Sequence, residues 1–200
     1  MAEQEEALAP LLAALRDLVA WLQATHVPGA IIGGVAASLL GRPRVTRDID
    51  AVVLLDEKDW VPFLGTGMQL GFVPRLSAPL GFAHTARVLL VRHESSGIDI
   101  DIACGALPFE EEAIRRAVWR DIGGISLPLP VPEDLIIMKA VAHRPRDMAD
   151  IESILDAHPK LDRRRVRRWV HEFSTALDIP EILQELNALL VQRKNRRRAT

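Results

Sequence analysis

The chain is poor in side chains that form disulfides or bind transition metals. It has one cysteine, Cys104, in 200 residues, so it cannot hold a disulfide framework or a zinc site built from cysteines. Five of its histidines also lack the spacing of metal ligands: His84, His93, His143, His158 and His171. This composition fits a reducing compartment, and we expect the protein in the cytoplasm.

The sequence also lacks a strong net charge and a membrane-length apolar run, and we expect no signal peptide. The formal charge is −2, so the overall charge does not steer the chain to nucleic acid. The first residues are acidic, Glu3-Gln4-Glu5-Glu6, and do not form the basic n-region of a signal peptide. No apolar run approaches the length of a bilayer span, so no membrane partner is expected.

Positive charge is nevertheless concentrated near the C-terminus. Arginines and one lysine crowd residues 163–168 and 193–198. Such runs are either a solvated helix face and a tail or contacts to RNA or substrate, and both interpretations remain open.

The pattern of apolar residues predicts a mixed fold. Hydrophobic residues make up 48% of the chain, enough for a proper core. Helical spacing predicts an amphipathic helix over residues 5–25. Short strands are expected at 30–32 and 48–55, and strict alternation predicts a strand over 98–102. From residue 108 onward the character becomes helical.

The remaining elements follow from the same periodicities and from turn residues. Helices are expected at 35–40, 57–64, 110–119, 132–143, 147–157, 162–177 and 180–193. Strands are expected at 72–75 and 85–93, a hairpin turn at 94–97, and a strand or an extended connection at 122–129. Gly65, Gly67 and Gly71 are expected to break the chain. The prediction is an α+β fold: a small mixed sheet flanked by helices over residues 1–130, including the N-terminal helix, and a helical region over 131–200 packed on that core.

Two aspartates open the strand at residues 48–55. Side chains alternate along a strand, so Asp48 and Asp50 point to the same face. Two neighbouring carboxylates repel each other and are costly without a cation between them. Mg²⁺ binds one or two carboxylates together with substrate phosphates. The pair is therefore a candidate metal site, the alternative being two solvated carboxylates at the start of a surface strand.

A glycine pair precedes these aspartates. Gly33 and Gly34 lead into a short helix of small residues. Glycine lets the backbone approach a ligand closely, and the N-terminus of the following helix favours anions. Metal-binding carboxylates beside a phosphate cradle indicate phosphoryl or nucleotidyl transfer.

The pattern Gly-Gly, short helix and Arg-x-Thr-x-Asp-x-Asp resembles the nucleotidyltransferases of the DNA polymerase β superfamily. Gly33, Gly34, Thr46, Asp48 and Asp50 match its motif. Where many members have Gly-Ser, this chain has Gly-Gly, as in the abortive-infection (AbiEii-like) toxins and the aminoglycoside or lincosamide nucleotidyltransferases. Residues 132–151 are also similar to the helical region of the AbiEii-like branch. The resemblance covers roughly residues 30–155 and implies a polymerase β-like nucleotidyltransferase core.

The resemblance implies a third carboxylate on a neighbouring strand. It would help to hold the metal, Mg²⁺ or Mn²⁺, and take the proton of the attacking hydroxyl. Asp99 and Asp101 both qualify, because alternation puts them on one face. The resemblance favours Asp101, and Asp99 lies nearer the turn.

Other polar residues are candidates for nucleotide binding. Thr46 belongs to the motif, and Arg47 either contacts phosphate or is a surface arginine. Lys139 lies in a nearly all-apolar helix, so it is either paired in the interior or faces a cleft. Asp147 and Asp150, three residues apart on one helix face, are its expected partners in the first case.

The expected activity is metal-dependent transfer of NMP from an NTP to a hydroxyl acceptor. The resemblance implies tRNA or a protein as acceptor, in a toxin–antitoxin system with a cognate antitoxin. An aminoglycoside- or lincosamide-type antibiotic nucleotidyltransferase is the alternative within enzymes. A non-catalytic nucleotide-binding protein that keeps the fold is the alternative outside them.

Overall fold

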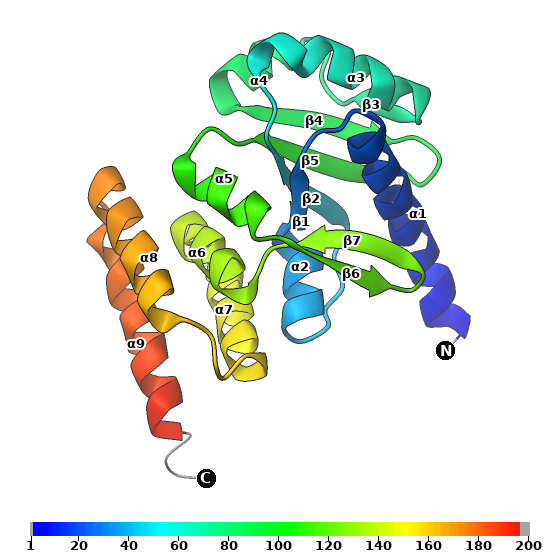
Figure 1. The fold of residues 1–200 in the computed structure, drawn as a ribbon. Helices are drawn as coiled ribbons and strands as arrows, with labels where there is room; N and C mark the ends of the chain where they lie inside the picture. The colour runs from blue at the N-terminus through cyan, green and yellow to red at the C-terminus, as the bar shows by residue number, and fades with distance from the viewer. Residues whose placement is uncertain (1, 197–200) are drawn as a thin grey trace. The chain divides into compact units, whose positions relative to one another are not determined.

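The structure is a computed structural model that describes the backbone of residues 2–196 and the side chains of residues 8–192. Contacts within the chain divide it into two compact units. The N-terminal unit comprises the residues up to 35 together with 45–130, and the C-terminal unit comprises 36–44 together with the residues from 131 onward. Helix α2 (Gly33–Leu40), labelled in Figure 1, has residues 33–35 in the N-terminal unit and residues 36–40 in the C-terminal unit.

The N-terminal unit is built on a mixed sheet. Within residues 2–196 this sheet has five strands in the order β1-β2-β5-β4-β3. Their bounds are β1 (Gly29–Ile32), β2 (Asp48–Val53), β3 (Phe72–Pro74), β4 (Val88–His93) and β5 (Ile98–Cys104). Strands β2 and β5 run parallel and the other neighbours are antiparallel. The predicted α+β class with a small mixed sheet is confirmed.

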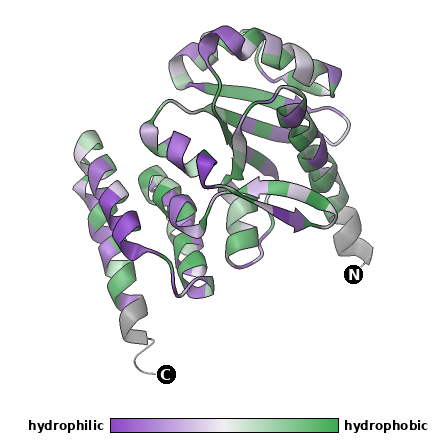
Figure 2. Ribbon diagram, viewed as in Figure 1, coloured by the Kyte–Doolittle hydropathy of each residue, from purple (hydrophilic) through white to green (hydrophobic). Residues whose placement is uncertain are grey.

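Alternation along the two central strands separates an apolar face from a polar one. Ile49 and Ile100 are fully buried, whereas the aspartates on either side of them point to the opposite face. Figure 2 draws β4 largely in the green of hydrophobic residues. The apolar face forms the core of the unit and leaves the acidic residues together on the other side.

Helices and aromatic rings cover the sheet of the N-terminal unit. Helix α1 (Ala2–Ala24) places Trp21 against Phe63 and Phe72, with ring centroids 4.3 and 4.9 Å apart. Phe63 belongs to α3 (Trp60–Gln69), which follows the short 3₁₀ helix η1 (Glu57–Asp59). The prediction that Gly65 and Gly67 break the chain is wrong, because both lie inside α3. A Cβ at Gly67 would collide with the Trp21 indole, so this glycine serves packing.

Two further elements differ from the sequence prediction. The expected strand at 85–93 begins only at Val88, because α4 (Pro79–Ala86) precedes it and ends at Arg87 in the left-handed conformation. Helix α5 (Pro108–Arg115) is shorter than the predicted 110–119 helix. Residues 118–129 form instead a hairpin of β6 (Val118–Ile122) and β7 (Ile125–Leu129). Its turn, Gly123-Gly124, has φ values of 59° and 79°, which glycine adopts readily.

The C-terminal unit is helical. It contains α6 (Pro132–Ala142), α7 (Pro145–Ala157), α8 (Arg163–Leu177) and α9 (Pro180–Arg196), close to the predicted helices. Helix α6 packs against α7, α8 and α9. Arg165 and Asp134 form an ion pair of 2.8 Å inside this bundle, and Figure 2 shows α8 largely in the purple of hydrophilic residues.

Across the described residues, none of the helices combines the length and apolar character needed to cross a lipid bilayer.

Candidate active site

Four carboxylates lie in register on two neighbouring strands of the N-terminal unit. The parallel pairing of β2 with β5 sets Asp48 beside Asp99 and Asp50 beside Asp101. Adjacent strands are about 4.8 Å apart, and residues paired in this way point to the same face. Alternation predicted each pair separately, and the family resemblance implied that one aspartate of the second pair lies on a strand next to the first. The structure sets both pairs in register as one acidic face.

Gly33 meets this acidic face at the end of β1. Ile32 pairs with Asp50 across the antiparallel β1–β2 ladder, so the chain turns into α2 directly beside that aspartate. Gly33 has a φ of 61°, and a Cβ there would overlap the Asp50 carboxylate. Glycine is therefore required twice, for its backbone conformation and for the close approach of Asp50. Gly34, the second residue of α2, is buried.

Two arginines contact the β5 aspartates. Arg92 lies opposite Asp99 on β4 and donates to it from Nε at 2.6 Å and from Nη2 at 3.1 Å. Arg75, the residue after β3, donates from Nη1 to Asp99 at 3.1 Å and from Nη2 to Asp101. The fork of one guanidinium thus bridges the two carboxylates of β5.

The environments of Asp99 and Asp101 shift their pKa values in opposite directions. The hydrogen bond from Arg92 is the main reason why the pKa of Asp99 is lowered. Partial burial raises the pKa of Asp101, and the negative charges of Asp48 and Asp99 add to this rise against the opposing effect of Arg75. A carboxylate with a raised pKa is the better proton acceptor near neutral pH.

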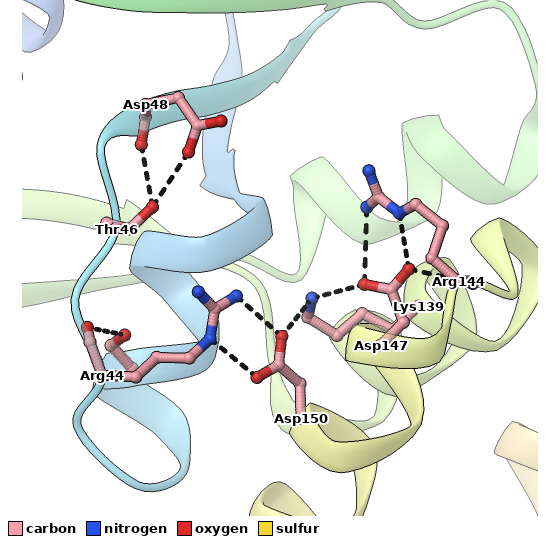
Figure 3. Close-up of polar contacts among 8 residues, drawn as sticks. Arg44, Thr46, Asp48, Lys139, Arg144, Asp147 and Asp150 are labelled. Atoms are coloured by element: carbon pink, nitrogen blue, oxygen red, sulfur yellow. Dashed lines mark hydrogen bonds and ion pairs between the residues drawn. The ribbon is translucent and has the colours of Figure 1, made fainter.

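Thr46 and Arg47 precede β2 in the N-terminal unit. The Thr46 hydroxyl lies 2.9 Å from Asp48 Oδ1 and 3.2 Å from the Asp48 carbonyl oxygen, so it can donate to either (Figure 3). This contact orients the Asp48 side chain at the first residue of β2. Arg47 is exposed beside it.

The donor set suits a hard divalent cation, because Asp48, Asp50 and Asp101 offer carboxylate oxygens from adjacent strands. Among the described residues, however, no group of three His, Cys, Asp or Glu side chains converges closely enough to hold a metal ion. Arg75 contacts Asp101 in this arrangement. The chemistry of the residues fits a hard cation, although their present side-chain positions do not form a metal group.

Lys139 belongs to the C-terminal unit and is paired there. Its Nζ lies 2.9 Å from Asp147 Oδ1 and 2.7 Å from Asp150 Oδ2, and its side chain is 4% exposed. Arg144 also contacts Asp147, at 2.7 Å, and Arg44 contacts Asp150 at 2.9 and 3.0 Å (Figure 3). These contacts favour the structural alternative for Lys139, and its role in nucleotide binding stays a prediction.

Most arginines of residues 163–168 bind within their own helical unit. Arg165 pairs with Asp134, Arg163 donates to the Leu190 carbonyl oxygen and Arg167 donates to Asn187. Arg168 lies 5.6 Å from the centre of the Trp169 ring and near Glu172. The side chains of the second cluster, residues 193–198, lie outside the described residues. These contacts lie within the bundle, and both interpretations of the first cluster stay predictions.

A cavity of about 590 Å³ lies elsewhere in the N-terminal unit. Its lining includes Leu54, Leu55 and Asp56, which follow the end of β2, together with Thr25 and His26. The acidic face begins at Asp48, at the opposite end of the same strand. The cavity and the four aspartates are thus separate features.

Sequence analysis missed two residues of this site, Arg75 and Arg92. A signal for Arg92 was present, because the predicted turn at 94–97 sets residue 92 opposite residue 99. No comparable signal existed for Arg75, which reaches β5 from the far side of β4.

Solved structures of other proteins share this fold. The crystal structure of an antigenic nucleotidyltransferase-like protein from Paracoccidioides brasiliensis aligns with a TM-score of 0.53 at 18% identity, over 87% of this chain and 92% of that one. The solution structure of the antibiotic-resistance factor ANT(2'')-Ia aligns with a TM-score of 0.55 at 17% identity, over 86% and 95%. The crystal structure of ANT(2'')-Ia with adenylyl-2''-tobramycin gives 0.51 at 19% identity, over 81% and 95%. These similarities confirm the predicted fold class.

The chain belongs to the family described as nucleotidyl transferase of unknown function (DUF2204), whose model matches residues 84–188. Its class of enzyme is therefore nucleotidyl transferase. A search of curated proteins gives no match. Membership of the AbiEii-like branch stays a prediction.

Proposed function

We propose that this protein binds an NTP with a divalent cation and transfers the NMP group to a hydroxyl of an acceptor. One observation carries the proposal: Asp48, Asp50, Asp99 and Asp101 are in register on adjacent parallel strands beside Gly33. Carboxylates in such a cluster repel each other unless positive charge lies among them. Arg75 and Arg92 already supply part of that charge.

The proposed roles follow from position. Asp48 and Asp50 would hold Mg²⁺ or Mn²⁺, with Asp101 as the third carboxylate. When bound, the cation would neutralise charge on the triphosphate. The backbone N–H groups of Gly33 and Gly34 would bind phosphate oxygens.

Two neighbouring residues complete the proposed site. Thr46 would keep Asp48 oriented through its hydroxyl contact. The exposed Arg47 would contact phosphate.

Asp101 is the proposed proton acceptor. The acceptor hydroxyl would lose its proton to Asp101 as its oxygen bonds to the α-phosphorus, and pyrophosphate would leave with the electron pair of the broken bond. Asp99, whose pKa is lowered by Arg92, is suited to hold the arginines in place.

The two β5 aspartates should therefore respond differently to mutation. Asp101→Ala should abolish transfer while NTP binding stays largely intact, because Asp48 and Asp50 would still hold the cation on the triphosphate and Asp101 acts on the acceptor. Asp99→Ala should retain measurable transfer, because the residue contacts arginines and not the reacting groups. Single-turnover rates and NTP titrations check this. An inactive Asp99→Ala variant beside a working Asp101→Ala variant would reverse the assignment.

The acceptor is proposed to be tRNA or a protein, in a toxin–antitoxin setting with a cognate antitoxin as partner. This part rests on the sequence resemblance to the AbiEii-like proteins. A small antibiotic is the second candidate, because ANT(2'')-Ia shares the fold and is described as an antibiotic-resistance factor. Arg164, Arg167 and Arg168 are the exposed arginines of the cluster on α8. Because Arg167 donates to Asn187 and Arg168 lies near Glu172, Arg164 is the one proposed to contact tRNA.

Incubation with each labelled NTP and Mg²⁺ tests the proposal. Bulk tRNA, cell protein and an aminoglycoside are offered as separate acceptors, and the label is followed into each. We expect one of these acceptors to become labelled, and we expect this labelling to require Mg²⁺. If tRNA is the acceptor, Arg164→Gln should weaken its association and lower the salt dependence, since fewer counterions are released. NTP binding without any transfer, to any acceptor, would support a non-catalytic nucleotide-binding protein.

A further inference from the structure

The contacts of Arg75 distinguish it from Arg92. Arg92 uses both Nε and Nη2 on Asp99 alone. Arg75 divides its guanidinium between Asp99 and Asp101 through its two Nη groups. Asp99 therefore keeps an arginine partner even if Arg75 moves, whereas Asp101 loses its charged contact.

We propose that Arg75 is a positioning residue that competes with the divalent cation for Asp101. The Arg75 guanidinium holds the Asp101 carboxylate until the cation binds, and it must release that oxygen for Asp101 to complete the metal group. This inference rests on the proposed function, in which Asp101 is a metal ligand. In this proposal, Arg75 sets the affinity of the site for the divalent cation.

The charge balance of the face supports such a competition. Asp48, Asp50, Asp99 and Asp101 carry four negative charges, and Arg75 and Arg92 carry two positive ones. The six side chains taken by themselves thus carry an excess of negative charge, which favours a cation beside them. A guanidinium and a hard cation both bind carboxylate oxygens. If both contact the same Asp101 oxygen, each interaction weakens the other.

Arg75 has a side chain that is partly exposed and incompletely hydrogen-bonded. Its backbone is fixed, because its N–H donates to the Leu90 carbonyl oxygen at 3.0 Å. Its side chain is 24% exposed, and its Nε is buried with no hydrogen-bond partner among the described residues. A buried donor without a partner makes the present position of the side chain less stable. The head group is thus held mainly by the two aspartates that it bridges.

Titration of the full-length, metal-free protein with Mn²⁺ alone, without nucleotide, tests the competition. If Asp101 is released in about a tenth of the molecules, Arg75→Gln should tighten Mn²⁺ binding about tenfold. Arg92→Gln is the matched control, because it removes the same charge from the same face but leaves Asp101 with Arg75. The increase in Mn²⁺ affinity caused by Arg92→Gln should be smaller than that caused by Arg75→Gln at both low and high salt. Salt screens the long-range effect of removing a charge, so a difference that persists at high salt reports the direct contact with Asp101.

A double variant separates direct competition from a general effect of charge. Arg75→Gln should no longer improve Mn²⁺ binding in an Asp101→Asn background, because the contested carboxylate is gone. Equal gains in the Arg75→Gln and Arg92→Gln variants, or no gain in Arg75→Gln, would overturn the inference while leaving the proposed function intact. Unchanged Mn²⁺ binding in Asp48→Asn/Asp50→Asn would instead show that the proposed metal site itself is wrong. Thermal melting measures whether Arg75→Gln destabilises the fold. A loss of stability would not by itself tighten Mn²⁺ binding, so it cannot imitate the expected result.

Discussion

Replacing Asp48 and Asp50 together by asparagine is expected to lower nucleotidyl transfer by about 10³-fold or more. The change removes both negative charges that would hold the cation, and the charge stabilisation of a bound metal amounts to several kcal/mol in the transition state. Size and shape are preserved. The amide oxygen that Asp48→Asn introduces could still accept the hydrogen bond that Thr46 gives to Asp48.

The fold of this double variant should survive. Asp48 and Asp50 point away from the apolar face on which Ile49 is buried, and their removal relieves repulsion with the β5 carboxylates. The free energy of unfolding should therefore stay the same or rise. Denaturant unfolding and circular dichroism check this beside the transfer assay.

A matched control uses two exposed aspartates of the same unit. Asp56→Asn with Asp121→Asn removes the same charge away from the acidic face. This control should keep near-normal transfer, since general changes in surface charge act weakly at a distance. Turnover near the wild-type rate in Asp48→Asn/Asp50→Asn would end the assignment of the metal site to these residues.

The sequence was sufficient for the parts of the site that depend on local periodicity. Alternation placed Asp48 with Asp50, and Asp99 with Asp101, on common faces, and the predicted strands are present. Their mutual register could not be derived, because parallel strands are joined through a long crossover and not through a turn. The structure supplies that register, which makes two separate pairs into one cluster.

Residues that act across the sheet were beyond sequence reasoning. Arg75 reaches Asp101 over the intervening β4 strand, so no spacing in the chain predicts their contact. Helix α4 was missed for a different reason: the alternation that begins at Val88 was extended too far toward the N-terminus. Gly67 was misread because glycine usually weakens a helix, whereas here it makes room for Trp21.

Lys139 shows the opposite case, in which local spacing offered the right partners. Asp147 and Asp150 are three residues apart on α7, and both contact the Lys139 ammonium. Sequence alone left open whether this lysine also faces a ligand, because the burial of a charged head group depends on packing. In the structure, its side chain is almost completely buried between the two carboxylates.

Lys139→Ala is therefore expected to destabilise the protein by roughly 3–5 kcal/mol. Removing one partner of a buried ion pair leaves the other charges uncompensated in the interior, and measured losses fall in that range. Urea unfolding followed by circular dichroism measures the change. Lys160→Ala is the matched control, because Lys160 is exposed in the same unit and its loss should cost no more than about 0.5 kcal/mol.

The pH dependence of this loss has a definite sign. Burial alone would raise the pKa of Asp147, but its hydrogen bonds with Arg144 and Lys139 outweigh burial and lower that pKa. Burial also raises the pKa of Asp150, and its hydrogen bonds with Arg44 and Lys139 outweigh burial and lower that pKa. A lowered carboxylate pKa contributes stability above the pKa of the unfolded chain, and this stability is lost as pH falls through the folded-state pKa. The difference between wild type and Lys139→Ala should thus be largest near neutral pH and shrink in acid.

NTP titration of Lys139→Ala distinguishes the structural role from contact with the triphosphate. At a temperature where the variant remains folded, its NTP affinity should match that of wild type, because the ammonium is already bound by two carboxylates. Lys139→Met is the informative companion. It keeps the length and apolar stem of the side chain but lacks the charge, so it should be nearly as unstable as the alanine variant if the ion pairs matter most. A variant with unchanged stability and weakened NTP binding would reject the structural role and return Lys139 to the nucleotide site.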